Sequence, residues 1–269
     1  MHDIPKLLAT LAQNALHEEL NTYPKPGLVS PIDQGSHPDM DYGLFLTSIN
    51  QLASYFNEVA STAMTEHNFT ALELLGLHAE QRLLLATHHI NTHRGAIFVL
   101  GLIVAATAYC YQHQLPYTHI SPTIPALYAQ GLAEHKINTD SHGYKIRQRY
   151  ALESIIDSAL KGFPLVFSAV TQLRQFEQDY EVTHAKLRTF FYIMQQLDDT
   201  NLLHRGGLSA LEFARSEAAN LLTITQPEDF NKQALVLHHE FIQKNLSPGG
   251  CADIFAATLF IDHVEQLWV

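Results

Sequence analysis

Four short segments rich in Gly, Asn, Asp, His and Arg stand beside apolar helical stretches of the sequence. They are residues 35–41, 91–96, 198–207 and 245–253. A helix N-terminus presents unpaired backbone N–H groups and the positive end of the helix dipole, so small and basic residues there favour a bound anion. The pattern predicts one site for a polyphosphate, assembled at several helix ends.

Acidic side chains in these segments are candidates for metal binding and acid–base chemistry. Asp198 and Asp199 are adjacent, and adjacent carboxylates suit Mg²⁺, which keeps water and phosphate oxygens as its other ligands. Asp39 follows the imidazole of His37, and Asp253 would project from the first turn of the last helix. A simpler interpretation also exists, because Asp39 fits a helix N-cap and Asp199 fits a capped helix end.

Basic and small residues supply the expected anion contacts. Lys25 stands between two prolines, so it loses little backbone entropy when it contacts a phosphate, although a plain helix-ending loop has the same composition. Asn91, His93 and Arg94 crowd into the step between two apolar helices, where a buried, hydrogen-bonded histidine is the alternative for His93. The Gly249-Gly250 pair lets a ligand approach the backbone at a helix start.

The composition argues against several classes of function. With a formal net charge of -11, no basic field covers a whole face, so binding to nucleic acid or to an anionic membrane is not expected. The histidines lack zinc-ligand spacing, and the chain has no phosphate-loop or dinucleotide-binding motif. Cys110 and Cys251 lie far apart in helical patterns, which indicates reduced core thiols. Because residues 1–16 do not resemble a signal peptide, we expect a cytoplasmic protein.

Apolar residues recur with a helical period along most of the chain, and alternating β-branched runs are scarce. The predicted helices cover residues 7–20, 44–59, 71–87, 97–111, 149–160, 165–176, 184–197, 208–222, 232–241 and 252–268. Residues 117–125 contain prolines and residues 138–143 are polar, so both stretches are predicted loops. We therefore expect an all-α fold, in a single globular multi-helix domain that spans residues 1–269.

The segment 95–111 is almost wholly apolar. Its length reaches the short end of the about 17–25 residues that a membrane span needs. No positive loop or aromatic belt marks a membrane interface beside it. The sequence therefore predicts a buried central apolar helix and no membrane association.

Several of these segments together resemble the triphosphoribosyl-dephospho-CoA synthase family, and they occur in that family's order. The matching segments are PKPGLV at 24–29, GSHPDMD at 35–41, NTHRGAIF at 91–98, LDDT at 197–200, LHRGG at 203–207, SPGG at 247–250 and AD at 252–253. Residues 198–207 and AATLF at 256–260 look more like the malonate decarboxylase branch than the citrate lyase branch.

The resemblance implies an all-helical enzyme that joins ATP to 3′-dephospho-CoA and expels adenine. The product would be 2′-(5″-triphosphoribosyl)-3′-dephospho-CoA, a prosthetic-group precursor. A phosphoribosyl-dephospho-CoA transferase would then load it onto an acyl carrier protein of malonate decarboxylase or citrate lyase. Mg²⁺ is the expected cofactor, and the enzyme could act as a homo-oligomer.

A ribosyl carbon that loses a nitrogen base passes through an oxocarbenium-like state, which carboxylates stabilise and which needs a base for the attacking hydroxyl. Our hypothesis assigns acid–base or sugar roles to Glu80, His37 and Asp253. It assigns Mg²⁺ to Asp199, with Asp39. The remaining candidates bind substrate: Lys25, Asn91, His93, Arg94, Arg205, Gly249 and Gly250. A lone Glu80 in a mostly apolar helix could equally face solvent.

The chain departs from the family pattern before the turn at residues 162–164. Ala151, Ile156 and Ser158 stand where the family often has a Gly, Arg and Glu arrangement, and Ser30 replaces an Asp. The lost Arg and Glu positions are either structural, replaced by Glu153, Asp157 or Arg149, or linked to a changed acceptor. Two other functions remain open: a helical Mg²⁺-dependent hydrolase of a ribosyl or phosphate ester, and a non-catalytic nucleotide-binding protein.

Overall fold

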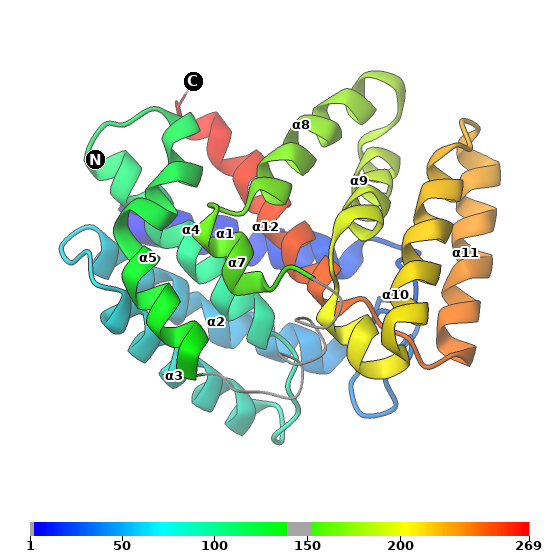
Figure 1. The fold of residues 1–269 in the computed structure, drawn as a ribbon, viewed down its shortest axis with the longest axis horizontal. Helices are drawn as coiled ribbons and strands as arrows, with labels where there is room; N and C mark the ends of the chain where they lie inside the picture. The colour runs from blue at the N-terminus through cyan, green and yellow to red at the C-terminus, as the bar shows by residue number, and fades with distance from the viewer. Residues whose placement is uncertain (1–2, 139–151, 269) are drawn as a thin grey trace.

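The structure, a computed structural model, describes residues 3–138 and 152–268 (Figure 1). Within those residues the chain forms α-helices and two short 3₁₀ turns but no strand, which confirms the predicted all-α class. The helices are α1 (Ile4–Asn21), α2 (Tyr42–Ala63), α3 (Phe69–Ala86), α4 (Arg94–Gln112), α5 (Ile120–Asn138), α7 (Ile155–Leu160), α8 (Pro164–Asp179), α9 (Val182–Gln196), α10 (Thr200–Leu222), α11 (Pro227–Gln243) and α12 (Gly249–Glu265). The 3₁₀ turns are η1 (Tyr117–His119) and η2 (Gln266–Trp268).

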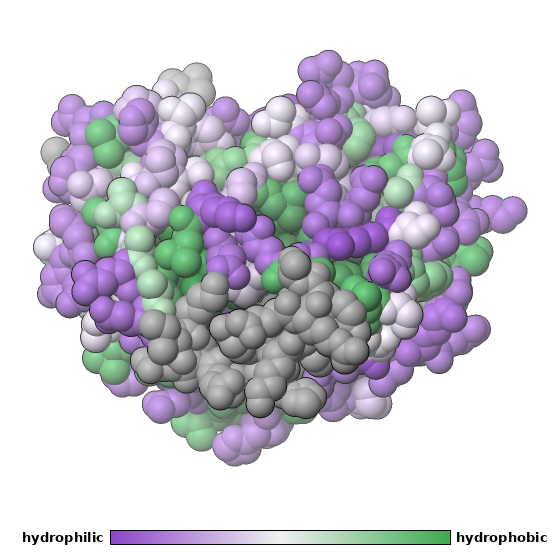
Figure 2. Space-filling view, viewed as in Figure 1, coloured by the Kyte–Doolittle hydropathy of each residue, from purple (hydrophilic) through white to green (hydrophobic). Residues whose placement is uncertain are grey.

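Two apolar helices, α4 and α12, pack against each other in the middle of the fold (Figure 1). Val104, Ala105 and Ala106 of α4 and Ala256 and Ala257 of α12 are buried, and such small side chains let helix axes approach closely. By length and composition alone, α4 could cross a membrane, but most of it lies inside the fold. The predicted buried central helix is therefore confirmed. The face shown in Figure 2 is mostly hydrophilic, with short apolar patches between polar side chains.

Short polar side chains at helix starts explain several boundaries. The Asp41 carboxylate accepts a hydrogen bond from Leu44 N at 2.8 Å and so caps α2, whereas Asp39, the N-cap suggested by the sequence, is exposed. Asn68 caps α3 in the same way. Each cap satisfies a backbone N–H that the helix cannot pair internally, and is worth about 1 kcal/mol.

The predicted loop at residues 117–125 is wrong, because these residues form η1 and the first turns of α5. Ile120, Ile124, Tyr128 and Leu132 are spaced four apart, and all four are buried. Pro122 falls in the first helical turn, where a missing N–H costs no internal hydrogen bond. The apolar period therefore outweighs the proline signal. Of the predicted loop at 138–143, Asn138 is the last residue of α5, and residues 139–143 lie outside the described residues.

Two other predicted boundaries also needed correction. The helix expected from residue 149 begins at Ile155, because Ser154 and Asp157 form a capping box there, while residues 149–151 lie outside the described residues. In addition, residues 200–206, which fall between the predicted helices 184–197 and 208–222, are helical. The interruption falls at Gly207 instead, where φ is 70° and α10 kinks.

Candidate active site

Two adjoining cavities lie at the N-terminal ends of α4, α10 and α12. The large cavity has a volume of about 640 Å³ and the small cavity one of about 150 Å³. They share five lining residues: Asn91, Arg94, Gly95, Asn201 and Asp253. All four polar segments singled out in the sequence contribute to the walls, so the structure brings these distant segments together around one compound site.

Asp253 lies where the two cavities meet and faces the first turn of α4. A Cβ atom on Gly95 would lie 1.8 Å from Asp253 Oδ2, so only glycine leaves room for this carboxylate. Burial, with further contributions from the Asp199 and Glu19 carboxylates, raises the pKa of Asp253 well above its usual value, although the Ala96 N–H acts in the opposite direction. A buried carboxyl group with a raised pKa at a cavity wall is a candidate for proton transfer.

Asp199 connects the starts of two helices. Its Oδ1 accepts hydrogen bonds from Asn201 N at 2.8 Å and Leu202 N at 3.2 Å in α10, and its Oδ2 accepts one from Cys251 N at 2.8 Å in α12. Burial raises the pKa of Asp199 against the opposing effect of these N–H groups. This geometry favours the helix-cap interpretation of Asp199 that the sequence left open.

The second expected metal ligand, Asp39, is exposed and lines neither cavity. Over residues 3–138 and 152–268 no group of three or more His, Cys, Asp or Glu side chains is placed to hold a metal ion. The geometry therefore does not join Asp39 to Asp199.

Asp199→Ala should reduce the stability of the fold, because it removes the cap of two helices. At about 0.5–2 kcal/mol per cap, we expect a loss of about 1–4 kcal/mol in the free energy of unfolding. Urea denaturation followed by circular dichroism measures this loss. Asp41→Ala, which removes the single exposed cap of α2, is the matched control and should cost less; an equal cost would contradict the bridging role.

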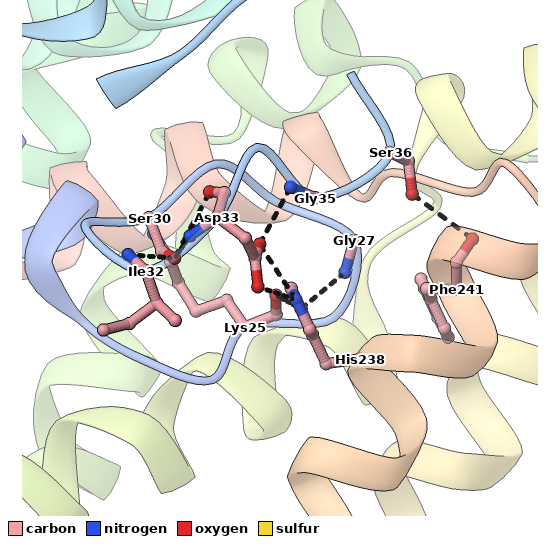
Figure 3. A network of polar contacts seen from close by, with 9 residues as sticks. All are labelled: Lys25, Gly27, Ser30, Ile32, Asp33, Gly35, Ser36, His238 and Phe241. Carbon is pink, nitrogen blue, oxygen red and sulfur yellow. Dashed lines mark hydrogen bonds and ion pairs between the residues drawn. The ribbon is translucent and has the colours of Figure 1, made fainter. Parts of the chain in front are cut away.

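The loop between α1 and α2, which carries Lys25 and His37, is held against α11 (Figure 3). The buried His238 ring contacts the Asp33 carboxylate through Nε2 at 3.0 Å and the Lys25 carbonyl through Nδ1 at 2.9 Å. Gly27 has a φ of 67°, and a Cβ there would lie 2.1 Å from the Leu246 carbonyl oxygen. The loop backbone is thus fixed where it forms a wall of the small cavity.

Arg205 and His37 face each other in the small cavity. Arg205 Nη1 donates to the carbonyl of Ser36 at 3.2 Å and to Asn245 Oδ1 at 2.9 Å, and Nη2 lies 3.2 Å from His37 Nδ1. His37 Nε2 lies 2.8 Å from Ser247 Oγ. Burial, followed by the positive charge of Arg205, lowers the pKa of His37 to about 4, so its imidazole is neutral at physiological pH.

Lys25 is 1% exposed and lines neither cavity. Its ammonium donates to the Glu19 carboxylate and to the Glu19 carbonyl. Burial lowers the pKa of Lys25 against the opposing effect of Glu19. Glu19, not Lys25, reaches the small cavity, which argues against the phosphate contact expected for Lys25. The sequence offered a signal for Glu19, because it stands between the buried Leu16 and Leu20.

Glu80 also lies outside the cavity walls. Its Oε1 pairs with Arg94 Nε at 3.0 Å. Arg94 lines both cavities, with a side chain that is 67% exposed. Glu80 therefore orients Arg94, and an acid–base role for Glu80 would need a movement of this pair.

Part of the wall of the large cavity is apolar. It is formed by Phe98, Ile155, Ile156, Pro164, Leu165 and Leu197. Ile156 and Ser158, two of the departures from the family pattern, both line this cavity. Of the three replacements considered, Glu153 lines it, Asp157 belongs to the α7 capping box, and Arg149 lies outside the described residues, as does Ala151. Ser30 instead stabilises the loop turn by accepting from Ile32 N at 3.2 Å.

Known proteins of one family match this chain along nearly its whole length. The profile of the ATP:dephospho-CoA triphosphoribosyl transferase family matches residues 5–269. A protein of Acinetobacter calcoaceticus, named a probable 2-(5''-triphosphoribosyl)-3'-dephosphocoenzyme-A synthase, is 36% identical over 267 residues, which cover 96% of this chain and 91% of that protein. A 2-(5''-triphosphoribosyl)-3'-dephosphocoenzyme-A synthase of Haemophilus ducreyi is 33% identical, with 94% of this chain and 87% of that protein covered.

The fold is also similar to that of a solved structure. It is an Archaeoglobus fulgidus protein provisionally named a triphosphoribosyl-dephospho-CoA synthase. The TM-score is 0.51 at 14% sequence identity, with 82% of this chain and 100% of that chain covered. At this identity the likeness concerns the fold alone.

Proposed function

This chain belongs to the ATP:dephospho-CoA triphosphoribosyl transferase family, and we propose that it joins ATP to 3′-dephospho-CoA with release of adenine. The 2′-oxygen of dephospho-CoA forms a bond to C1 of the ATP ribose, and the bond from C1 to adenine breaks. The hydroxyl proton passes to a base, and adenine leaves with a proton on its ring. The triphosphate stays on the transferred ribose.

The observation that carries this proposal is the position of Asp253 at the junction of two cavities, within a family match that covers residues 5–269. A carboxylate where both substrates meet can act as a base and stabilise positive charge on the ribose. Asp253 is the base that we assign to the 2′-hydroxyl, because its raised pKa brings it closer to the operating pH, where general-base catalysis is most effective. Its charge also stabilises the oxocarbenium-like ribose.

We retain Mg²⁺ as part of the proposal, bound as the complex with ATP. The ion would be held mainly by phosphate oxygens, with the amide oxygens of Asn91 and Asn201 on the shared wall, which leaves Asp253 free to act as the base. Asp199 contributes less, because both of its oxygens accept backbone N–H groups. The ion would neutralise phosphate charge and orient the triphosphate.

The finer assignments also remain proposals. We assign the product to the prosthetic group of malonate decarboxylase, on the sequence of residues 198–207 and 256–260. A phosphoribosyl-dephospho-CoA transferase would consume it and modify an acyl carrier protein. The enzyme would act in the cytoplasm, alone or as a homo-oligomer.

The test of the proposed function is the release of adenine from ATP, followed by chromatography and mass spectrometry. With ATP, dephospho-CoA and Mg²⁺ together, one adenine should form for each coupled product. Without dephospho-CoA, adenine should not form. Release of free ribose triphosphate would identify a hydrolase instead, and the absence of adenine under all conditions would indicate a nucleotide-binding protein without catalysis.

A further inference from the structure

We propose that the small cavity binds the triphosphate chain of the donor nucleotide, with Nε2 of His93 as a hydrogen-bond donor to a phosphate oxygen. This inference rests on the proposed function and assigns one part of the donor substrate to one part of the site. It is carried by the contacts of His93, by the charges around it and by the sizes of the two cavities.

His93 presents a buried nitrogen with no partner. The residue is 4% exposed and lines the small cavity, and among the described residues Nε2 has no hydrogen-bond partner. The other ring nitrogen, Nδ1, is bonded to Ser48 Oγ, which lies 2.7 Å from Thr92 Oγ1. Phe45 packs edge-on against the ring at a centroid distance of 4.9 Å. A buried polar atom without a partner is costly, so a ligand atom is the expected partner.

The chemistry of the ring fits an anion. Burial, then the positive charges of Lys25 and His17, lower the pKa of His93 to about 3, so the ring stays neutral. When the Ser48 hydroxyl donates to Nδ1, the proton of the neutral ring resides on Nε2. A phosphate oxygen can only accept, so this tautomer is the one that matches it.

The surrounding groups favour negative charge. The N-termini of α4 and α12 both reach the small cavity, and neither N-cap residue forms a side-chain cap, although Asn91 Oδ1 accepts from Arg94 N and Asp199 Oδ2 accepts from Cys251 N. Among the described residues Arg205 forms no ion pair, because its acceptors, the Ser36 carbonyl and Asn245 Oδ1, are neutral, whereas Arg94 is paired with Glu80. The two acids on the wall are Glu19, which is paired with Lys25, and Asp253, whose pKa is raised by burial. Anions bind well where helix N-termini meet an arginine that has no acidic partner.

Cavity size separates the parts of the substrates. Pockets that enclose a nucleotide-sized ligand measure roughly 300–1,000 Å³. The small cavity, at about 150 Å³, is below this range and suits a phosphate chain, while the large cavity, at about 640 Å³, falls within it. With the triphosphate in the small cavity, C1 of the donor ribose lies toward the shared wall and Asp253.

The test uses isothermal titration of the full-length protein with inorganic triphosphate and, separately, with dephospho-CoA. Arg205→Gln should weaken triphosphate binding about 10–100-fold, because it removes a charge-assisted hydrogen bond. His93→Phe keeps the ring packing and should weaken it about 3–10-fold through the loss of one neutral bond. His93→Gln should restore part of this loss, and Ser48→Ala should weaken binding less than His93→Phe does. Dephospho-CoA binding should stay unchanged in all four variants.

Leu165→Ala, in the apolar wall of the large cavity, is the matched control and should weaken dephospho-CoA but not triphosphate. Thermal unfolding shows that each variant is folded. The inference is overturned if wild-type protein does not bind triphosphate, or if Arg205→Gln and His93→Phe affect only dephospho-CoA. If either of these results is found but the enzyme still forms the coupled product, the proposed function stands and only the triphosphate site is rejected. If the variants change triphosphate binding as expected but no adenine is released under any condition, the proposed function is rejected and the triphosphate site stands.

Discussion

Asp253→Asn is expected to lower kcat by about 10²–10⁴-fold, the range that a general acid or base contributes. The substitution keeps the size of the side chain beside Gly95 but cannot accept the proton of the 2′-hydroxyl. Single-turnover adenine release measures the chemical step directly. Asp262→Asn on the same helix is the matched control, because Asp262 pairs with Arg174 and lines neither cavity. It should leave kcat unchanged.

The pH dependence of this variant gives an independent check. Because the base must be ionised, wild-type activity should fall as the pH drops through the raised pKa of Asp253, and this acid limb should vanish in Asp253→Asn. A folded-state pKa above the unfolded value means that the native state holds the proton more tightly. Stability from this group is therefore present at low pH and is lost as the pH rises through the folded pKa. In Asp253→Asn this loss of stability at higher pH should be absent. If the acid limb of the activity profile is unchanged in Asp253→Asn, another residue is the base.

Lys25→Met should destabilise the fold by about 3–5 kcal/mol, the cost of leaving one partner of a buried ion pair uncompensated. Lys25 and Glu19 are both buried and contact each other directly. Without the ammonium, the Glu19 carboxylate would have to stay charged in a buried place or take up a proton. Urea denaturation at neutral pH measures the change in the free energy of unfolding.

The double variant Lys25→Met, Glu19→Gln should recover most of the lost stability, because no buried charge then lacks its partner. This result would distinguish an ion pair inside the fold from the phosphate contact that the sequence suggested. A lysine that only binds phosphate would give a variant of normal stability with a raised KM for ATP. That outcome would contradict the role we assign to Lys25.

The sequence predicted the fold well where apolar periodicity was long. Residues 97–111 and 254–261 contain little but apolar and small residues, and they lie in the two central helices α4 and α12. It failed at α5, because two prolines near its start resemble a loop until the buried spacing from Ile120 to Leu132 is considered. It also missed the start of α7, which a local capping box defines.

The site could be predicted in outline but not in its pairings. Polar residues that interrupt apolar helices mark the segments around the cavities, since burying polar groups without hydrogen-bond partners is costly. Sequence position does not reveal which acid faces a ligand and which one caps a helix. Asp199 caps α10 and contacts α12, while Asp253 faces the shared wall. Similarly, Glu80 orients Arg94 and Glu19 reaches the small cavity, and both results depend on contacts between separate helices.

A crystal structure of the protein with bound product tests most directly whether both substrates meet at this compound site. We predict density for the triphosphate in the small cavity beside Arg205 and His93. The new bond between the two riboses should lie next to the Asp253 carboxylate. Product bound with its triphosphate away from both cavities, or with the inter-ribose bond remote from Asp253, would contradict the account.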